Sequence, residues 1–395
     1  MTINIFDKNK NFNILLAGIL ASIVGLGVAR FAFTSLLPPM LDDFLSVTNA
    51  GLLASVNYIG YITGAIASVF MKDINAKVRF FQLGMIISIL TTLILAVTTN
   101  ETLWFLSRII AGFGSAMVLL VGSSIIMLKL DYADKTKAMG IHFSGIGFAI
   151  VVGDIISQYS LLEGTWQDAW MSLSVVGVLM SLYVLHIVRF DTKVKNNAVK
   201  HPVSLSMFTP YVLFLIAAYF TSGVGYVVQA TFLPDIINSL EGLEGSGSIG
   251  WLIAGLSGIF SSIFWMRMAH RYDTLTVMII TFVLQVIGIL IPTFSNDLTL
   301  NLLSGVLYGS TFIGHVALFL SYGGKLAGKN PVIFMGAFTA AYGIGQIFAP
   351  LYSVSLYEAY GNYNMTLYVT AFIVSLGIVF LLFAKRLEKS SVAKV

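Results

Sequence analysis

Four ionisable side chains interrupt long apolar stretches of this sequence, and they are the first candidates for chemistry. They are Arg30, Arg108, Asp154 and His315. A full charge at the centre of a bilayer costs at least ~2.5 kcal/mol, so such a side chain needs a protein interior or a wet space around it. A buried arginine suits the binding of an anion, and a buried aspartate or histidine suits the uptake and release of a proton.

Arg30 lies in the stretch GLGVARFAFTSLLPPM, residues 25–40. At helical spacing Gly27, Arg30 and Thr34 share one face, which leaves room beside the guanidinium. The two prolines near the end of the stretch predict that the helix stops there.

A weaker copy of this stretch, GVGYVVQATFLP, occurs about half a chain later. A shift of 196 residues places Gly27 on Gly223 and Arg30 on Tyr226. Two further pairs of segments, RIIAGFG with GVLYGST and GIG with GIG, match at shifts of 197 and 198. A duplication of this kind predicts two related halves with a site between them, where the copies differ.

The charges inside the apolar stretches do not balance. Asp154 offers one carboxylate, whereas Arg30 and Arg108 offer two guanidiniums. Buried charges need partners, so we expect a surplus positive charge that an anionic substrate could satisfy. Two structural alternatives remain open. Arg108 and Asp154 could form an ion pair that locks two helices together, or Arg30 could be the structural partner of Asp154.

Polar side chains recur at helical spacing on several of the apolar stretches. Stripes of this kind line either a cavity or a helix–helix seam. As residues that bind substrate we predict Arg30, Thr34, Asn57, Tyr61, Tyr226, Gln229, Tyr308, Thr311, His315, Tyr342 and Gln346. For proton coupling we predict Asp154 or His315 as the titrating group, with Arg108 tuning it.

The elements that must position these residues are membrane helices. The chain of 395 residues is 57% hydrophobic and 10% charged, with a mean hydropathy of +0.89, whereas soluble domains carry about 25% charged residues. Runs of about 20 apolar residues can span a bilayer as helices. We predict twelve, at residues 12–37, 49–71, 80–98, 103–128, 138–161, 168–188, 211–234, 249–268, 275–294, 298–322, 332–356 and 364–384.

Basic residues give the orientation and the division of the chain. Except for Arg30 and Arg108, all Lys and Arg lie in or beside alternate connections, which predicts that both termini are cytoplasmic. The longest polar connection predicts a cytoplasmic linker at 189–209 between a six-helix bundle at 1–188 and another at 210–395.

Composition also narrows the function classes. The chain has no cysteine, which excludes disulfides and thiolate metal sites, and no Ser/His/Asp grouping or metal-ligand spacing is evident. We expect no cofactor, no enzymatic activity and no nucleic-acid partner. We expect a monomer in the lipid bilayer that binds a small-molecule substrate together with a co-transported proton.

The pattern as a whole resembles the major facilitator superfamily. Arg108, Gly112, Gly114 and Ala116 in RIIAGFGSA resemble the motif of that superfamily associated with proton coupling. Within it, ARFAFTSLLPPM, GYVVQATFLP and YGIGQIFAP resemble the YbfB/YjiJ group of bacterial transporters. The resemblance covers the whole chain and implies an inner-membrane transporter that works by alternating access.

Three functions remain to be weighed. The first is a secondary transporter of a small organic anion, coupled to protons. The second is an efflux transporter for a metabolite or drug, and the third is a non-transporting membrane receptor on the same scaffold. The absence of long soluble extensions in the sequence speaks against the receptor.

Overall fold

The computed structural model describes residues 10–71, 74–130, 135–189, 207–326 and 332–392, and within these ranges every regular element is a helix. Twelve helices or helix series are long and apolar enough to cross a membrane, and all twelve predicted spans are confirmed. Their ends fall within two turns of the predicted limits. Most of the predicted linker at 189–209 lies outside the described residues.

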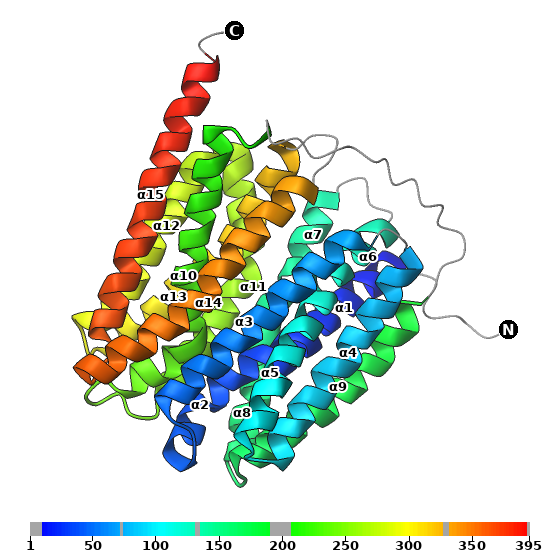
Figure 1. The fold of residues 1–395 in the computed structure, drawn as a ribbon, viewed down its shortest axis with the longest axis vertical. Coiled ribbons are helices and arrows are strands. Elements are labelled where there is room, and N and C mark those ends of the chain that lie inside the picture. Colours follow the sequence, from blue (N-terminus) through cyan, green and yellow to red (C-terminus); the bar gives the residue numbers. More distant parts are fainter. Residues whose placement is uncertain (1–9, 72–73, 131–134, 190–206, 327–331, 393–395) are drawn as a thin grey trace, which may run out of the picture.

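The first six spans form one bundle (Figure 1). They consist of α1 (Lys10–Ser22), η1 (Ile23–Phe31) and α2 (Ala32–Asp43); α3 (Val47–Phe70); α4 (Ile74–Val97); α5 (Glu101–Ala116), η2 (Met117–Val121) and α6 (Gly122–Lys129); α7 (Lys135–Phe143) and α8 (Gly145–Leu161); and α9 (Trp166–Ile187).

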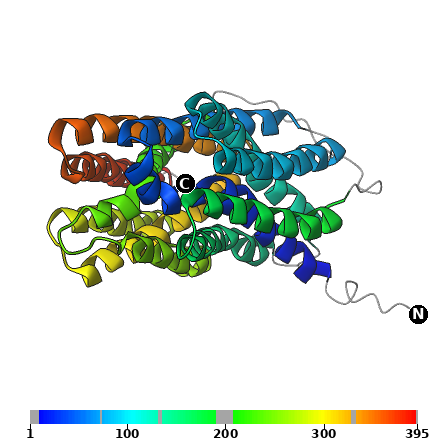
Figure 2. The same cartoon turned by 90° about the horizontal axis from the view of Figure 1, so that it is seen from below.

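The other six spans form a second bundle beside it, and the view from below separates the yellow, orange and red helices from the blue and cyan ones (Figure 2). They consist of α10 (Pro210–Asn238), α11 (Gly247–Arg271), α12 (Thr274–Leu290) with the short η4 (Ile291–Thr293), α13 (Leu298–Leu326), α14 (Val332–Tyr360) and α15 (Asn364–Val392).

The first span differs from its prediction in two ways: the helix continues through its prolines, and it contains a π-helical segment. Pro38 and Pro39 do not end the helix, because α2 continues through them to Asp43. A proline removes one backbone hydrogen bond, but in a membrane bundle neighbouring groups can satisfy the carbonyls that it frees. Before α2, the segment η1 is π-helical and completely buried. Arg30 lies at the end of this π-helical segment, a kind of distortion that is frequent at functional sites.

The two bundles meet mainly along α3 with α14, α8 with α11, and α2 with α10, and α7 makes a smaller contact with α11. The tightest approach to backbone of the other bundle is at Gly147 on α8, where an added Cβ would lie 2.4 Å from the backbone nitrogen of Ile259 on α11. Glycine is required here because any side chain would collide with the backbone of the other bundle.

Hydroxyl groups join the bundles across this interface. Thr34 Oγ1 donates to the carbonyl of Ala230, and Ser55 Oγ donates to the carbonyl of Ile347 at 3.1 Å. We call the end of the molecule where α9 ends and α10 begins the linker end. Both bonds lie away from it. Nearer the linker end, Ser262 Oγ donates to a carbonyl of α7 at 3.0 Å.

Candidate functional site

Arg30 lies in a box of tyrosine rings at the meeting point of the two bundles. Its side chain is 7% exposed. The guanidinium carbon lies 4.4 Å from the ring centroid of Tyr58 and 5.0 Å from that of Tyr61, both on α3. The ring of Tyr226 on α10, in the other bundle, is 5.7 Å away. Rings from both bundles therefore surround the cation, and their π-faces attract it.

The guanidinium nevertheless has unused donors. Nε and Nη2 of Arg30 are buried and have no hydrogen-bond partner. No carboxylate oxygen of a described residue lies within 4.0 Å of Arg30 or of Arg108. Burial of a charged donor without an acceptor is costly, and native proteins keep such groups mainly where a ligand or a water satisfies them.

Arg108 has a different environment, inside the first bundle. Its Nη1 donates to the carbonyl of Ala29 at 3.0 Å, and its guanidinium carbon lies 4.5 Å from the ring centroid of Phe33. The carbonyl of Arg108 in turn accepts a hydrogen bond from Asn57 at 2.8 Å. Arg108 thus ties α5 to the first span and to α3, which is a packing role.

Asp154 on α8 is buried at 2% exposure, and its Oδ1 has no hydrogen-bond partner. It lies beside Ser35 and Gln158 and forms no ion pair with Arg30 or Arg108. The structure therefore contains neither of the structural Arg–Asp pairs that the sequence left open. Asp154 is a buried acid without a fixed cation, which makes it a candidate to carry a proton.

The second bundle presents a stack of aromatic rings toward Arg30. The rings of Tyr226 and Tyr308 are 6.4 Å apart, those of Tyr308 and Trp251 are 6.3 Å apart, and Tyr342 lies 5.7 Å from Tyr226. The hydroxyl of Tyr308 and the indole N–H of Trp251 are buried and have no partner. Orphaned polar tips on apolar rings suit a ligand that is partly apolar and partly polar.

Three glutamines of the second bundle also have unused acceptors, and two of them, Gln229 and Gln346, are predicted site residues, whereas Gln285 is not. The Oε1 atoms of Gln229 and Gln346 are buried without a hydrogen-bond partner. Gln229 Nε2 reaches Ser304 Oγ at 3.5 Å, a long contact. Their amides could hydrogen-bond a bound molecule without first breaking a strong internal bond.

Other predicted site residues are engaged in packing. Thr34 bonds the carbonyl of Ala230, and Thr311 bonds the carbonyl one turn earlier on its own helix. His315 lies inside the second bundle, where its Nδ1 is 2.7 Å from Ser222 Oγ and its ring is 4.4 Å from that of Phe282. These contacts place His315 away from the tyrosine box.

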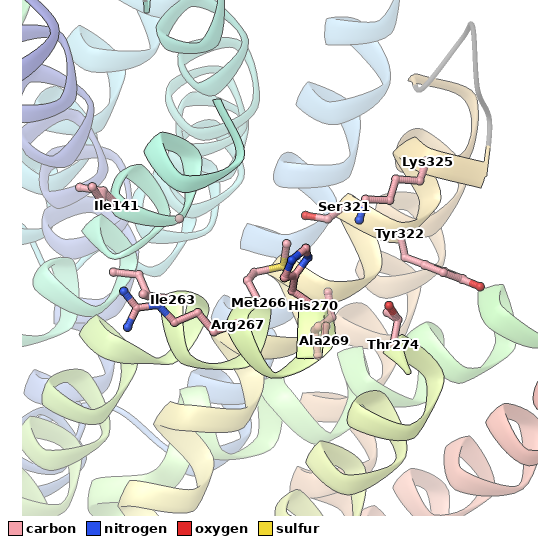
Figure 3. Close-up of a pocket in the computed structure, with 12 residues that line it drawn as sticks. Ile141, Ile263, Met266, Arg267, Ala269, His270, Thr274, Ser321, Tyr322 and Lys325 are labelled. Carbon is pink, nitrogen blue, oxygen red and sulfur yellow. The ribbon is translucent and has the colours of Figure 1, made fainter. Parts of the chain in front are cut away.

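A separate cavity of about 700 Å³ lies at the linker end (Figure 3). It is bounded by α7 of the first bundle and by α11, α12 and α13 of the second. Its lining residues are Gly140, Ile141, Ile263, Met266, Arg267, Ala269, His270, Thr274, Leu318, Ser321, Tyr322 and Lys325. Several of these side chains are exposed, so the cavity reaches the surface.

Comparison with known proteins assigns the chain to a family. The sequence profile described as "Uncharacterised MFS-type transporter YbfB" matches residues 22–382, nearly the whole chain. The chain belongs to this YbfB-type transporter family. It is therefore a transporter of the major facilitator type and a multi-pass membrane protein.

Relatives of this YbfB-type transporter are distant. It is 21% identical to the uncharacterized transporter YybO of Bacillus subtilis, over 90% of this chain and 89% of that protein. It is 22% identical to the multidrug efflux pump SdrM of Staphylococcus aureus, but there the match covers 41% of this chain and only 37% of the pump. A crystal structure of a mutant of the nucleoside transporter NupG superposes with a TM-score of 0.73 at 15% identity, covering 95% of this chain and 100% of that chain.

Sequence reasoning missed two members of the tyrosine box and its aromatic stack in this YbfB-type transporter. Tyr58 precedes the predicted Tyr61 by three residues on α3, so helical spacing could have identified it. Trp251 carried no such signal, because it lies near the start of α11 among glycines and apolar residues. Within the described residues no group of three or more His, Cys, Asp or Glu is placed to hold a metal ion.

Proposed function

We propose that this transporter carries a small organic anion by alternating access, with the carboxylate of the substrate on Arg30. The observation that supports the proposal most strongly is the pair of unpartnered donors on the Arg30 guanidinium, at the place where both bundles contribute side chains. A planar guanidinium fits a carboxylate through two parallel hydrogen bonds.

The surroundings of Arg30 support a substrate with an apolar body. The rings of Tyr226, Tyr308 and Trp251 offer apolar faces, and the free hydroxyl and indole N–H at their edges offer polar contacts. Since the cation belongs to one bundle and the ring stack to the other, a bound anion would contact both. Rocking of the bundles would then alter the fit, as alternating access requires.

Proton coupling is the second part of the proposal, and Asp154 is its carrier. Its carboxyl is buried, has one unpartnered oxygen, and lies on α8, which packs against both η1 and α11. Movement of either neighbour would change the solvation of the carboxyl, and a change in solvation moves a proton on or off.

For the cellular setting we propose the bacterial inner membrane, with both termini in the cytoplasm. The supporting observation is the placement of Lys and Arg in alternate connections. Because the chain has no cysteine, Lys195→Cys gives a single reactive site in the linker. An impermeant thiol reagent should leave that site unlabelled in intact cells, and labelling would reverse the assigned orientation.

The test of the substrate class is a thermal-shift screen of the purified protein against small carboxylates and matched neutral amides. For a carboxylate that binds, Arg30→Ala and Arg30→Lys should both weaken binding roughly ten- to a hundredfold, because lysine cannot reproduce two parallel bonds. Arg271→Ala is the control, since Arg271 is exposed at the end of α11, where its guanidinium contacts the ring of Tyr272.

Two results would contradict the proposal. Amides could bind as well as carboxylates, or Arg30→Ala could bind the carboxylate as tightly as the parent.

Efflux of a metabolite or drug is the second candidate function, and the similarity to the pump SdrM favours it. Accumulation by inside-out vesicles and exclusion by intact cells would indicate efflux, and the opposite pattern would indicate uptake.

A further inference from the structure

The cavity at the linker end is distinct from the tyrosine box around Arg30. The deepest of its lining residues on α13 is Leu318, whereas Tyr308 of the ring stack lies ten residues earlier on the same helix. At a rise of ~1.5 Å per residue the two positions are about 15 Å apart. A solute at the cavity would therefore not yet touch the central site.

The charges on the cavity wall have one sign. Arg267 on α11 and Lys325 on α13 line it, and among the described residues that line it there is no Asp or Glu. Figure 3 shows the guanidinium of Arg267 pointing toward the side of Ile141 and the ammonium of Lys325 extending toward Ser321. The two cations thus lie on two helices, at different sides of the cavity wall.

Two acids of the described residues near the cavity wall are engaged elsewhere. Asp273, which precedes the lining residue Thr274, forms an ion pair with Lys385 on α15 at 3.1 Å. Glu388, also on α15, accepts a hydrogen bond from the Tyr322 hydroxyl at 2.9 Å. Both carboxylates are thus engaged on the α15 side of the second bundle.

The rest of the wall is largely apolar. Ile141, Ile263, Met266 and Leu318 contribute aliphatic surface. A pocket with aliphatic walls and a few convergent cations suits a ligand with an anionic head and an apolar body. An inorganic anion would leave the aliphatic part unused, and a cation would be repelled.

We propose that this cavity is a vestibule that binds amphiphilic organic anions, which the field of Arg267 and Lys325 attracts, with the anionic head at the Arg267 side and the apolar body on the aliphatic wall. Walls of low dielectric concentrate the field of the two cations and raise the local concentration of anions. Delivery of the anion from the vestibule to Arg30 rests on the proposed function. Binding of the anion in the vestibule does not rest on it.

The charge preference can be measured without knowing the substrate. Ser321→Cys places a single thiol on the cavity wall of this cysteine-free chain. The thiol is reacted with two methanethiosulfonate reagents, one with an anionic sulfonate group and one with a cationic trimethylammonium group. Each reaction rate is divided by the rate of the same reagent with a free small thiol, and the two ratios are compared. We expect the anionic reagent to be favoured about three- to tenfold, from Coulomb energies at an effective dielectric near the surface value.

A matched pair of arginines controls this experiment. In the Ser321→Cys background, Arg267→Gln should remove most of the preference, whereas Arg271→Gln should leave it unchanged, because Arg271 lies one turn further along α11 and does not line the cavity. No preference, a preference for the cationic reagent, or equal effects of the two substitutions would overturn the proposal.

The ligand class is tested with a fluorescent pair in phosphatidylcholine nanodiscs. Dansylglycine is an anion with an apolar body, and its amide is the neutral match. We expect saturable fluorescence enhancement with the acid only, weakened about three- to tenfold by Arg267→Gln and unaffected by Arg271→Gln. Equal binding of the amide, or displacement of the acid when phosphatidylglycerol replaces phosphatidylcholine, would overturn the proposal, and displacement would assign the cavity to lipid headgroups.

Arg30→Ala separates this proposal from the proposed function. The reagent preference at Ser321→Cys should persist in that variant. If Arg30 proves dispensable for carboxylate binding while the preference persists, the central anion site is refuted and the vestibule stands. If carboxylate binding needs Arg30 but the preference is absent, the vestibule is refuted alone.

Discussion

The guanidinium carbon of Arg30 lies 4.4 Å from the centroid of the Tyr58 ring, although Nε and Nη2 of the same guanidinium have no hydrogen-bond partner. The ring face offers cation–π attraction of about 0.5–2 kcal/mol but no lone pair for the N–H groups. The contact therefore holds the cation in place and leaves its directional bonding capacity for another molecule.

This relationship predicts different stability effects at the two buried arginines, neither of which has a counterion among the described residues. Arg30→Met should leave the unfolding temperature unchanged or raise it, because it removes a buried charge without a counterion. Arg108→Met should be less favourable than Arg30→Met by about 1–3 kcal/mol in the free energy of unfolding, because it also takes the donor from the Ala29 carbonyl. Thermal unfolding followed by tryptophan fluorescence compares them. A larger loss at Arg30 would identify it as a structural residue.

A second prediction concerns proton coupling. Asp154→Asn should make flux of the carboxylate found by the screen insensitive to an imposed pH gradient, because the amide cannot exchange a proton. His315→Gln should keep the gradient dependence and lose stability, since His315 packs against Ser222 and Phe282. Flux through reconstituted vesicles is the measurement. If His315→Gln abolishes gradient dependence and Asp154→Asn does not, the two roles are reversed.

A third prediction concerns the contact between the bundles. Gly147→Ala should destabilise the protein by about 1–3 kcal/mol, because its Cβ would overlap the backbone of α11 at Ile259. Gly336→Ala on α14 is the matched control, since an added Cβ there meets nothing within 4 Å. Thermal unfolding of both variants gives the comparison. Equal unfolding temperatures would mean that α8 and α11 are not held this closely.

A fourth prediction concerns pH and the ion pair at the linker end. Burial alone would raise the pKa of Asp273, but hydrogen bonds from Thr276 and Lys385 outweigh it and lower that pKa. The stabilisation is therefore present above the unfolded pKa of about 3.9 and is lost as the pH falls through the folded value.

Asp273→Asn should accordingly cost less than ~1 kcal/mol near neutral pH, as is usual for partly exposed pairs. The difference in unfolding temperature between parent and variant should shrink as the pH is lowered below ~4, the range in which the carboxylate takes up its proton. A difference that grows toward acid would show that the carboxylate is not stabilised by its partners.

The sequence was sufficient to predict the spans, because each needs about 20 apolar residues and this requirement is local. It was insufficient for the path of the first span. Pro38 and Pro39 were read by their local effect alone, whereas the packed bundle carries α2 through them. The π-helical η1 was not predicted either; its Gly25 lies so close to Val118 of another span that an added Cβ would overlap that side chain.

The candidate site was predictable by residue type but not by partner. Buried Arg30, Tyr61, Tyr226 and Tyr308 were identified as polar groups on helix faces, and they do come together. The sequence left open an ion pair between Asp154 and one of the two arginines, and the structure contains no such pair. Pairing depends on how helices are rotated against each other, and one sequence does not determine that rotation. The binding roles themselves remain predictions.

Three of the hydrogen bonds between the bundles are of a kind that can be exchanged. Thr34, Ser55 and Ser262 each donate a hydroxyl to a carbonyl of the other bundle. If the bundles separate, a rotation about χ1 lets each hydroxyl bond a carbonyl one turn earlier on its own helix. No polar group need then be stranded in the apolar interior. The exchange therefore removes a hydrogen-bonding penalty from any separation of the bundles, and a ligand would shift such an equilibrium by its difference in affinity for the two arrangements.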